Sequence, residues 1–171
     1  KIRLENAEFK LKAKEALDLK EIAEKEKEQA ITMYNNYYAK YKDIIDTNNI
    51  VIKTDIHLNI TYVNELFCEI SGFDSSELIG KEFKFLKFSD VANDIYTNLY
   101  ADVLNNKPWK GKLKNTKKDG SYYHTDTYVI PTFDETGEMT GVISIQKDIT
   151  EELNKKREIQ LALMREKSDL F

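Results

Sequence analysis

The first 46 residues, Lys1 to Asp46, contain neither proline nor glycine and are rich in glutamate, lysine and alanine. These residue types favour helices, so the segment predicts one unbroken helix. One row of mostly apolar residues recurs every seven positions, and a second row follows it by four positions, which is the pattern of a coiled-coil seam. The first row is Ile2, Phe9, Ala16, Ala23, Ala30, Tyr37 and Ile44, and the second is Ala13, Lys20, Lys27, Tyr34 and Tyr41.

A helix of this length rises about 1.5 Å per residue, so it is longer than a small domain can cover. The seam must therefore be buried on a partner, and the simplest partner is a second copy of the chain. This predicts a homodimer through a coiled-coil input helix over residues 1–47. Lys20 and Lys27 weaken the seam, so a single amphipathic helix folded back on the domain is the alternative.

The hydrophobic period changes at Ile50, after a polar stop over residues 46–49. Two short strands come first, then short helices, then a longer amphipathic helix and three strands joined by tight turns. The predicted strands span residues 50–52, 60–63, 109–117, 122–133 and 140–149, and the helices span residues 65–71 and 94–105, with a capped helix between them that starts at Asp74. This order predicts an α+β domain over residues 48–150.

The composition excludes several classes of function. A net charge of -4 with interleaved basic and acidic residues gives no support for nucleic-acid binding. The single cysteine, Cys68, allows no internal disulfide and fits a reducing, cytoplasmic compartment. No apolar run approaches the roughly 20 residues that cross a bilayer, so we expect no membrane contact within this chain. Neither a catalytic constellation nor a metal cluster is present, so we predict no enzyme activity here.

The chain carries two sets of motifs that resemble those of a PAS domain. The first set comprises Thr61-Tyr62-Val63-Asn64-Glu65, Phe67-Cys68-Glu69-Ile70-Ser71-Gly72-Phe73 and Glu77-Leu78-Ile79-Gly80-Lys81. The second set comprises Pro108-Trp109-Lys110-Gly111, Lys117-Lys118-Asp119-Gly120-Ser121, Asp134-x-x-Gly137 and residues 141–150, which read Gly141-Val142-Ile143-Ser144-Ile145-Gln146-Lys147-Asp148-Ile149-Thr150. The resemblance implies a five-stranded antiparallel sheet with short helices on one face and a small-molecule pocket between them. It also implies a sensory or interaction module, usually dimeric.

Comparison with cofactor-binding types of PAS domain names no cofactor for this chain. The light-oxygen-voltage type has a reactive cysteine where Phe83 stands here, so cysteine adduct photochemistry is not available. The pattern is closer to the aerotaxis-receptor type, but Tyr100 replaces its tryptophan and residues 88–92 lack its histidine and prolines, which speaks against flavin. Haem-binding types use a histidine on a helix facing the sheet, whereas His57 and His124 lie outside the helices and are predicted to be exposed. A small polar ligand, or none, is left.

The same resemblance turns one row of polar side chains inward on two neighbouring strands, with Tyr100 and Trp109 bounding the pocket. The pocket candidates are Tyr100, Trp109, Thr125, Thr127, Ser144 and Gln146. Buried hydroxyls and amides need partners, so the cavity would hold a polar ligand or ordered water. The alternative is that Ile143, Ile145, Tyr128 and Ile130 form the core and the polar row is solvated.

Asp148-Ile149-Thr150 ends the last strand and opens directly onto a charged helix, predicted over residues 151–171. Either Asp148 or Thr150 can cap that helix, and Asp148 can pair with Lys117 or Lys118 at the first hairpin. The resemblance implies that this motif couples the sheet to a signalling helix. An incomplete apolar stripe on the helix fits a second dimer contact; its members are Leu153, Ile159 or Gln160, Leu163 and Leu170.

Two functions follow. The first is a sensory PAS module of a bacterial signal-transduction protein, with helical input and output and an effector (a histidine kinase, a diguanylate cyclase or a chemoreceptor signalling domain) beyond Phe171. It can be the cytoplasmic part of a membrane-anchored receptor. The second is a ligand-free PAS module that dimerises and spaces the helices.

Overall fold

The computed structural model describes residues 2–168, and the side chains of residues 6–167. The chain forms two compact units, Lys1–Ile44 and Ile45–Phe171. In the part of the chain described, no helix is both long enough and apolar enough to cross a membrane.

The first unit consists of one helix, α1 (Ile2–Asn48), which continues into the second unit and ends there. Every side chain from residue 6 to residue 44 is exposed, including Phe9, Tyr34 and Tyr37 of the seam. Tyr37 and Tyr41 lie against each other with ring centroids 5.5 Å apart. The seam is therefore not buried within a single chain. Its first member, Ile2, has a side chain outside the described ones.

The second unit is built on a five-stranded sheet in the order β2-β1-β5-β4-β3, in which all neighbours are antiparallel. The strand that ends the domain, β5, lies at the centre between β1 and β4. The strands are β1 (Ile50–Thr54), β2 (Ile60–Val63), β3 (Trp109–Thr116), β4 (Tyr122–Phe133) and β5 (Met139–Asp148).

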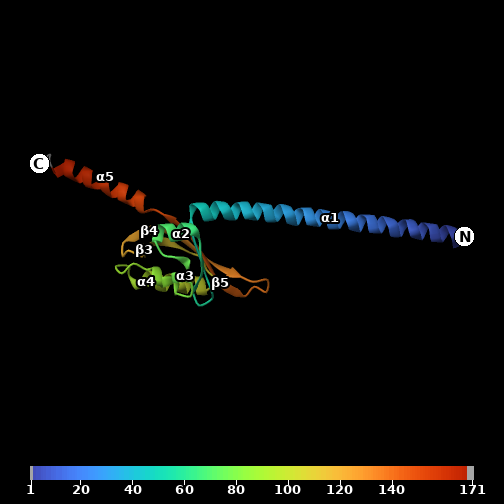
Figure 1. The fold of residues 1–171 in the computed structure, drawn as a ribbon, viewed down its shortest axis with the longest axis horizontal. Coiled ribbons are helices and arrows are strands. Elements are labelled where there is room, and N and C mark those ends of the chain that lie inside the picture. The colour runs from blue at the N-terminus through green and yellow to red at the C-terminus, as the bar shows by residue number, and fades with distance from the viewer. Residues whose placement is uncertain (1, 169–171) are drawn as a thin grey trace. The chain divides into compact units, whose positions relative to one another are not determined.

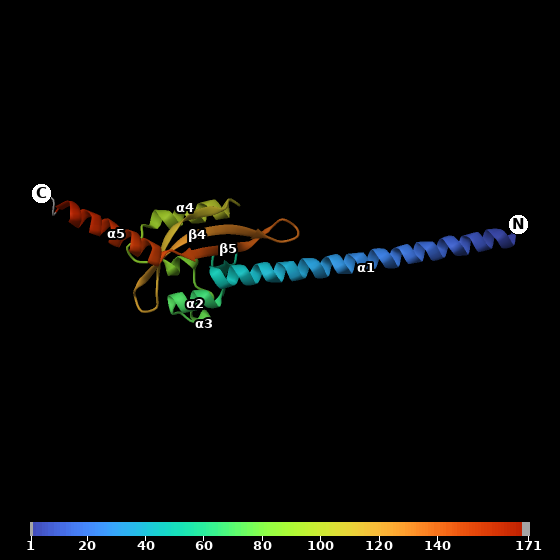
Figure 2. The same cartoon turned by 90° about the horizontal axis from the view of Figure 1, so that it is seen from above.

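Short helices cover one face of this sheet. In Figure 2, which views the molecule from above, α4 lies along one edge of the covered face, and α2 and α3 lie along the other edge. Local caps set these helices: the Asn64 side chain caps α2, Gly72 ends it in a left-handed conformation, and Asp74 with Glu77 forms the predicted capping box of α3. The elements are α2 (Glu65–Ser71), α3 (Ser75–Leu78), the 3₁₀ helix η1 (Phe83–Leu86), α4 (Asn93–Leu104) and, after β5, α5 (Thr150–Ser168), shown in Figure 1.

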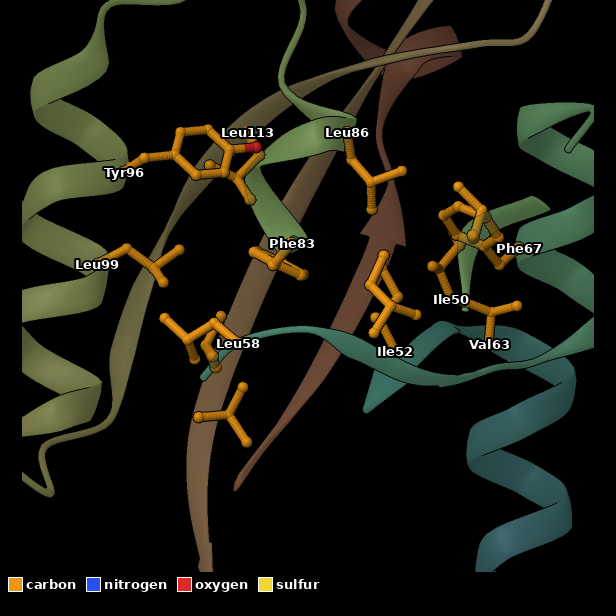
Figure 3. Close-up of a cluster of buried hydrophobic side chains, with 14 of the residues drawn as sticks. Ile50, Ile52, Leu58, Val63, Phe67, Phe83, Leu86, Tyr96, Leu99 and Leu113 are labelled. Atoms are coloured by element: carbon orange, nitrogen blue, oxygen red, sulfur yellow. The ribbon is translucent and has the colours of Figure 1, made fainter. Parts of the chain in front are cut away.

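The hydrophobic core fills the space between the sheet and these helices. Figure 3 shows Phe83 of η1 between Leu99 of α4 and Ile52 of β1, with Phe67 of α2 on the far side. All four side chains are at most 2% exposed. The predicted α+β fold, a five-stranded antiparallel sheet with short helices on one face, flanked by a long helix before it and a helix after it, is confirmed.

Candidate functional site

Five polar side chains on the inner face of the sheet are almost completely buried. We call them the inner polar cluster: Asn115 of β3, Thr125 and Thr127 of β4, and Ser144 and Gln146 of β5, each at most 1% exposed. Their neighbours along the strands, Ile143, Ile145 and Tyr128, face the other side and are half-buried or exposed. The polar row therefore points inward, and the alternative in which the isoleucines form the core and the polar row is solvated is wrong.

The inner polar cluster is held together by its own hydrogen bonds. The Asn115 amide donates to Gln146 Oε1 at 3.2 Å and, more weakly, to Thr125 Oγ1 at 3.4 Å. The Gln146 amide donates to Ser144 Oγ at 3.0 Å, and the hydroxyls of Thr125 and Thr127 lie 2.8 Å apart. All five side chains are neutral, so the cluster suits a neutral polar group better than an ion.

Within the part of the chain that the structure describes, two tyrosine hydroxyls are buried in this core without a hydrogen bond of normal geometry, those of Tyr96 on α4 and Tyr123 on β4. Burial raises the pKa of both well above the usual tyrosine value, so both stay protonated and can donate. The Asn115 side chain lies within hydrogen-bonding reach of the Tyr123 hydroxyl and lowers its pKa, against the larger effect of burial. A buried donor without a partner costs free energy, so these two hydroxyls are the groups in the core that an additional hydrogen-bond acceptor would satisfy.

The two predicted aromatic boundary residues pack against the hydrophobic core. The Tyr100 hydroxyl accepts a hydrogen bond from the backbone N–H of Lys84 at 3.0 Å, and burial raises its pKa to about 12. The Trp109 indole lies over Gly111, where an added Cβ would be 2.5 Å from the ring. Thus Tyr100 ties α4 to η1, and Gly111 leaves room for Trp109.

The second part of the site is the output joint, Asp148-Ile149-Thr150, where β5 runs directly into α5 (Figure 1). Asp148 Oδ1 accepts hydrogen bonds from Thr150 N–H at 2.9 Å and Thr150 Oγ1 at 2.6 Å. Thr150 Oγ1 in turn accepts from His124 N–H at 2.8 Å, and Ile149 N–H donates to the His124 carbonyl at 2.9 Å. The first turn of α5 is therefore fastened to both β5 and β4.

The two hairpin lysines, Lys117 and Lys118, have other partners than Asp148. Lys118 Nζ pairs with the Glu77 carboxylate of α3 at 2.8 Å, which lowers the pKa of Glu77. Lys117 holds the β3–β4 turn by donating its N–H to the Ser121 carbonyl. The predicted ion pair of Asp148 with one of them is not formed among the described residues: Lys118 pairs with Glu77, and Asp148 Oδ1 accepts from Thr150 instead.

His57 is exposed as predicted, but His124 is half-buried. Its ring meets Tyr122 edge to face, with centroids 5.3 Å apart. Desolvation, assisted by the nearby Lys114 ammonium, lowers the pKa of His124 below its usual value. The imidazole is therefore neutral near pH 7.

In the apolar stripe of α5, Leu153 is half-buried, Ile159 and Leu163 are exposed, and Leu170 lies outside the described residues.

Sequence reasoning missed Asn115, Tyr96 and Tyr123. The inward row of β3 could have revealed Asn115, because it continues Trp109, Gly111 and Leu113 by one further step of two residues. The two tyrosines lie in regular elements, but nothing in the sequence marks a hydroxyl as unpartnered.

A sheet with one helix-covered face, a neutral polar cluster on that face and a strand that continues into a helix is the arrangement that the resemblance to PAS domains implies. Residues 47–151 match the family model described as PAS domain, and the chain belongs to that family.

Relatives and solved structures agree with this assignment. A "Nitrogen fixation regulatory protein" of Klebsiella pneumoniae is 32% identical over 57% of this chain and 20% of its own length. The "Aerotaxis receptor" of Escherichia coli is 27% identical over 64% of this chain and 21% of its own length. The crystal structure of a PAS domain from Colwellia psychrerythraea superposes with a TM-score of 0.59 at 22% identity, covering 67% of this chain and 98% of that one. The chain thus spans about a fifth of the length of these curated relatives.

Proposed function

We propose that this chain is a sensory relay module of a bacterial signal-transduction protein, with α1 as its input and α5 as its output. One observation carries the proposal: β5 contributes Ser144 and Gln146 to the inner polar cluster and, two residues later, Asp148 to the output joint. A change beneath the helices can therefore reach α5 along one strand. The prediction of a sensory PAS module agrees with the family match and with the signalling relatives.

The ligand that would suit the inner polar cluster and the two buried tyrosine hydroxyls best is a small neutral molecule with a hydrogen-bond acceptor. PAS domains of the light-oxygen-voltage type bind flavin, which makes flavin a candidate. Phe83 occupies the position of the reactive cysteine, which excludes the cysteine adduct, and it is 2% exposed within the packed core (Figure 3). Against flavin itself, Tyr100 stands where the aerotaxis-receptor type has its tryptophan, and residues 88–92 lack that type's histidine and prolines. The inner polar cluster carries no charge, and the Tyr96 and Tyr123 hydroxyls are buried donors that an acceptor atom of a ligand would satisfy. We therefore favour a small polar ligand over flavin.

Replacing the buried hydroxyl of Tyr123 tests whether the site holds a guest. If the hydroxyl donates to a ligand, Tyr123→Phe should lower the free energy of unfolding of the purified protein by about 1 kcal/mol. It should also reduce the fraction of protein that retains the ligand in native mass spectrometry. Tyr122→Phe is the matched control, because that neighbouring ring faces outward and is 39% exposed. It should change neither quantity.

The second candidate function is a ligand-free module that dimerises and spaces the helices. It is favoured by the fact that the inner polar cluster already satisfies much of its own hydrogen bonding. In that case Tyr123→Phe should stabilise the protein, because it removes a buried hydroxyl that has no hydrogen bond of normal geometry among the described residues. Native and denatured masses should then be the same.

We further propose that the module is a homodimer in the cytoplasm, joined through α1 and extended through α5. Support comes from the uncovered seam of α1, whose apolar members are exposed in the single chain. Ala30→Lys places a charge on the seam and should weaken the dimer about tenfold in sedimentation equilibrium. Ala39→Lys makes the same substitution off the seam and should leave the dissociation constant unchanged. Equal effects of the two variants would contradict the seam.

A further inference from the structure

Asn64, between β2 and α2, forms hydrogen bonds to three different parts of the second unit. Its Oδ1 accepts from Val51 N–H of β1 at 3.0 Å and from Phe67 N–H of α2 at 3.2 Å. Its amide nitrogen donates to the carbonyls of Asp46 at 2.9 Å and Asn49 at 2.8 Å, at the end of α1. Its own backbone N–H donates to the Val51 carbonyl at 3.1 Å.

The side chain is only 4% exposed and uses both of its amide hydrogens and both lone-pair directions of its oxygen. No single substitution can reproduce this set, because only a carboxamide of this length offers two donors and two acceptors. The last turn of a helix leaves its carbonyls without partners inside the helix. Asn64 supplies a donor to one of them, that of Asp46, while Asn49 N–H donates to another, that of Ile45.

We propose that Asn64 is the input joint of this module, a positioning residue that fastens the last turn of α1 to β1 and α2. A displacement of that turn then moves β1, which pairs with β5, the strand that carries the output joint. This inference rests on the proposed relay function and goes beyond it, because it assigns the entry point of the movement to one side chain.

Asn64→Asp isolates the contact with α1. Aspartate keeps the acceptor oxygens for Val51 and Phe67 and is an equally good helix cap, but it loses both donors to Asp46 and Asn49. In the full chain, amide hydrogen exchange over residues 45–49 should become about tenfold faster, while exchange in β4 and β5 stays at the wild-type rate. Asn64→Ser, whose hydroxyl caps α2 but is too short to reach α1, should have the same effect and serves if the aspartate variant does not fold.

The matched control is Asn105→Asp. The Asn105 amide also donates to a carbonyl in the last turn of a helix, that of Ala101 in α4, at 2.7 Å. This change should leave exchange over residues 45–49 unaltered. Wild-type exchange there in both Asn64 variants would overturn the proposal, and so would an equal acceleration throughout the sheet, since Asn64 would then be a general stability residue.

A double-mutant cycle tests transmission. Ala30→Lys, which loosens the pairing of α1, should speed exchange of the β1 amides about threefold when Asn64 is present and leave it unchanged in the Asn64→Asp background. An equal response in both backgrounds, or none in either, would overturn the input joint. Neither result bears on the relay from β5 to α5, which is measured separately at Asp148.

Discussion

The intact protein carrying Asp148→Ala is expected to lose its stimulus-dependent output while its PAS domain remains folded. The change removes the carboxylate that accepts both Thr150 donors, so the first turn of α5 keeps its place only through the His124 bonds. The global cost should be that of one lost helix cap, about 1 kcal/mol. Exchange of the amides over residues 150–154 should become about tenfold faster, and output should change at least tenfold less between stimulated and unstimulated states.

The chain offers a closely matched control for this experiment. In the β4–β5 turn, Asp134 Oδ1 accepts from Thr136 N–H at 2.8 Å and from Thr136 Oγ1 at 2.6 Å, the same Asp-x-Thr arrangement as in the output joint. Asp134→Ala should therefore have a comparable local effect but leave α5 and the output unchanged. A normal response of the Asp148→Ala protein would contradict the relay function, whatever its stability.

Local signals in the sequence predicted several elements closely. Helix α2 begins at Glu65 and ends at Ser71 as expected, because a capping asparagine precedes it and a glycine follows it. The Asp74–Glu77 capping box and the tight turns at Gly120 and Gly137 are equally local, since each depends on residues within four positions of one another. Such patterns need no knowledge of the tertiary fold.

The inner polar cluster could be predicted only in part. Alternation alone allowed either face of β5 to be buried, and the family resemblance was needed to turn Gln146 inward. The 3₁₀ helix Phe83–Leu86 was not predicted, because four residues are too few to show a period. This short helix places the Phe83 side chain in the core, a position that no local motif in the sequence indicates.

Contacts between distant segments could not be predicted. Lys118 lies in the turn between β3 and β4, and Asp148 lies on the strand that pairs with β4. The partner of Lys118 is nevertheless Glu77, which is 41 positions away. Asn64 belongs to one of the motifs that carry the family resemblance, yet its bonds to Asp46 and Asn49 depend on how α1 ends. In both cases the partner is chosen by tertiary geometry, and the sequence shows only that the residue can form a hydrogen bond.

Gly141→Ala is expected to destabilise the domain by about 3 kcal/mol. Gly141, near the start of β5, has φ of +155°, and an added Cβ would lie 1.9 Å from the Thr54 carbonyl oxygen at the end of β1. The obstacle is backbone in a paired strand, so it cannot move without disturbing the β1–β5 register at Thr54 and Val142. Urea unfolding followed through the fluorescence of Trp109, the single tryptophan, measures this cost.

Gly137→Ala separates this close approach from backbone conformation alone. Gly137 has φ of +85° in the β4–β5 turn, with no heavy atom within 4 Å of the added Cβ, so its cost should be about 1 kcal/mol. Equal costs at the two positions would mean that β5 can withdraw from Thr54 cheaply. The strand would then be loosely seated beside β1, and a movement entering at β1 could not be passed to Gln146 and Asp148. A large difference, in contrast, means that β5 cannot withdraw from β1 without a high cost, which is the mechanical condition for a relay between α1 and α5.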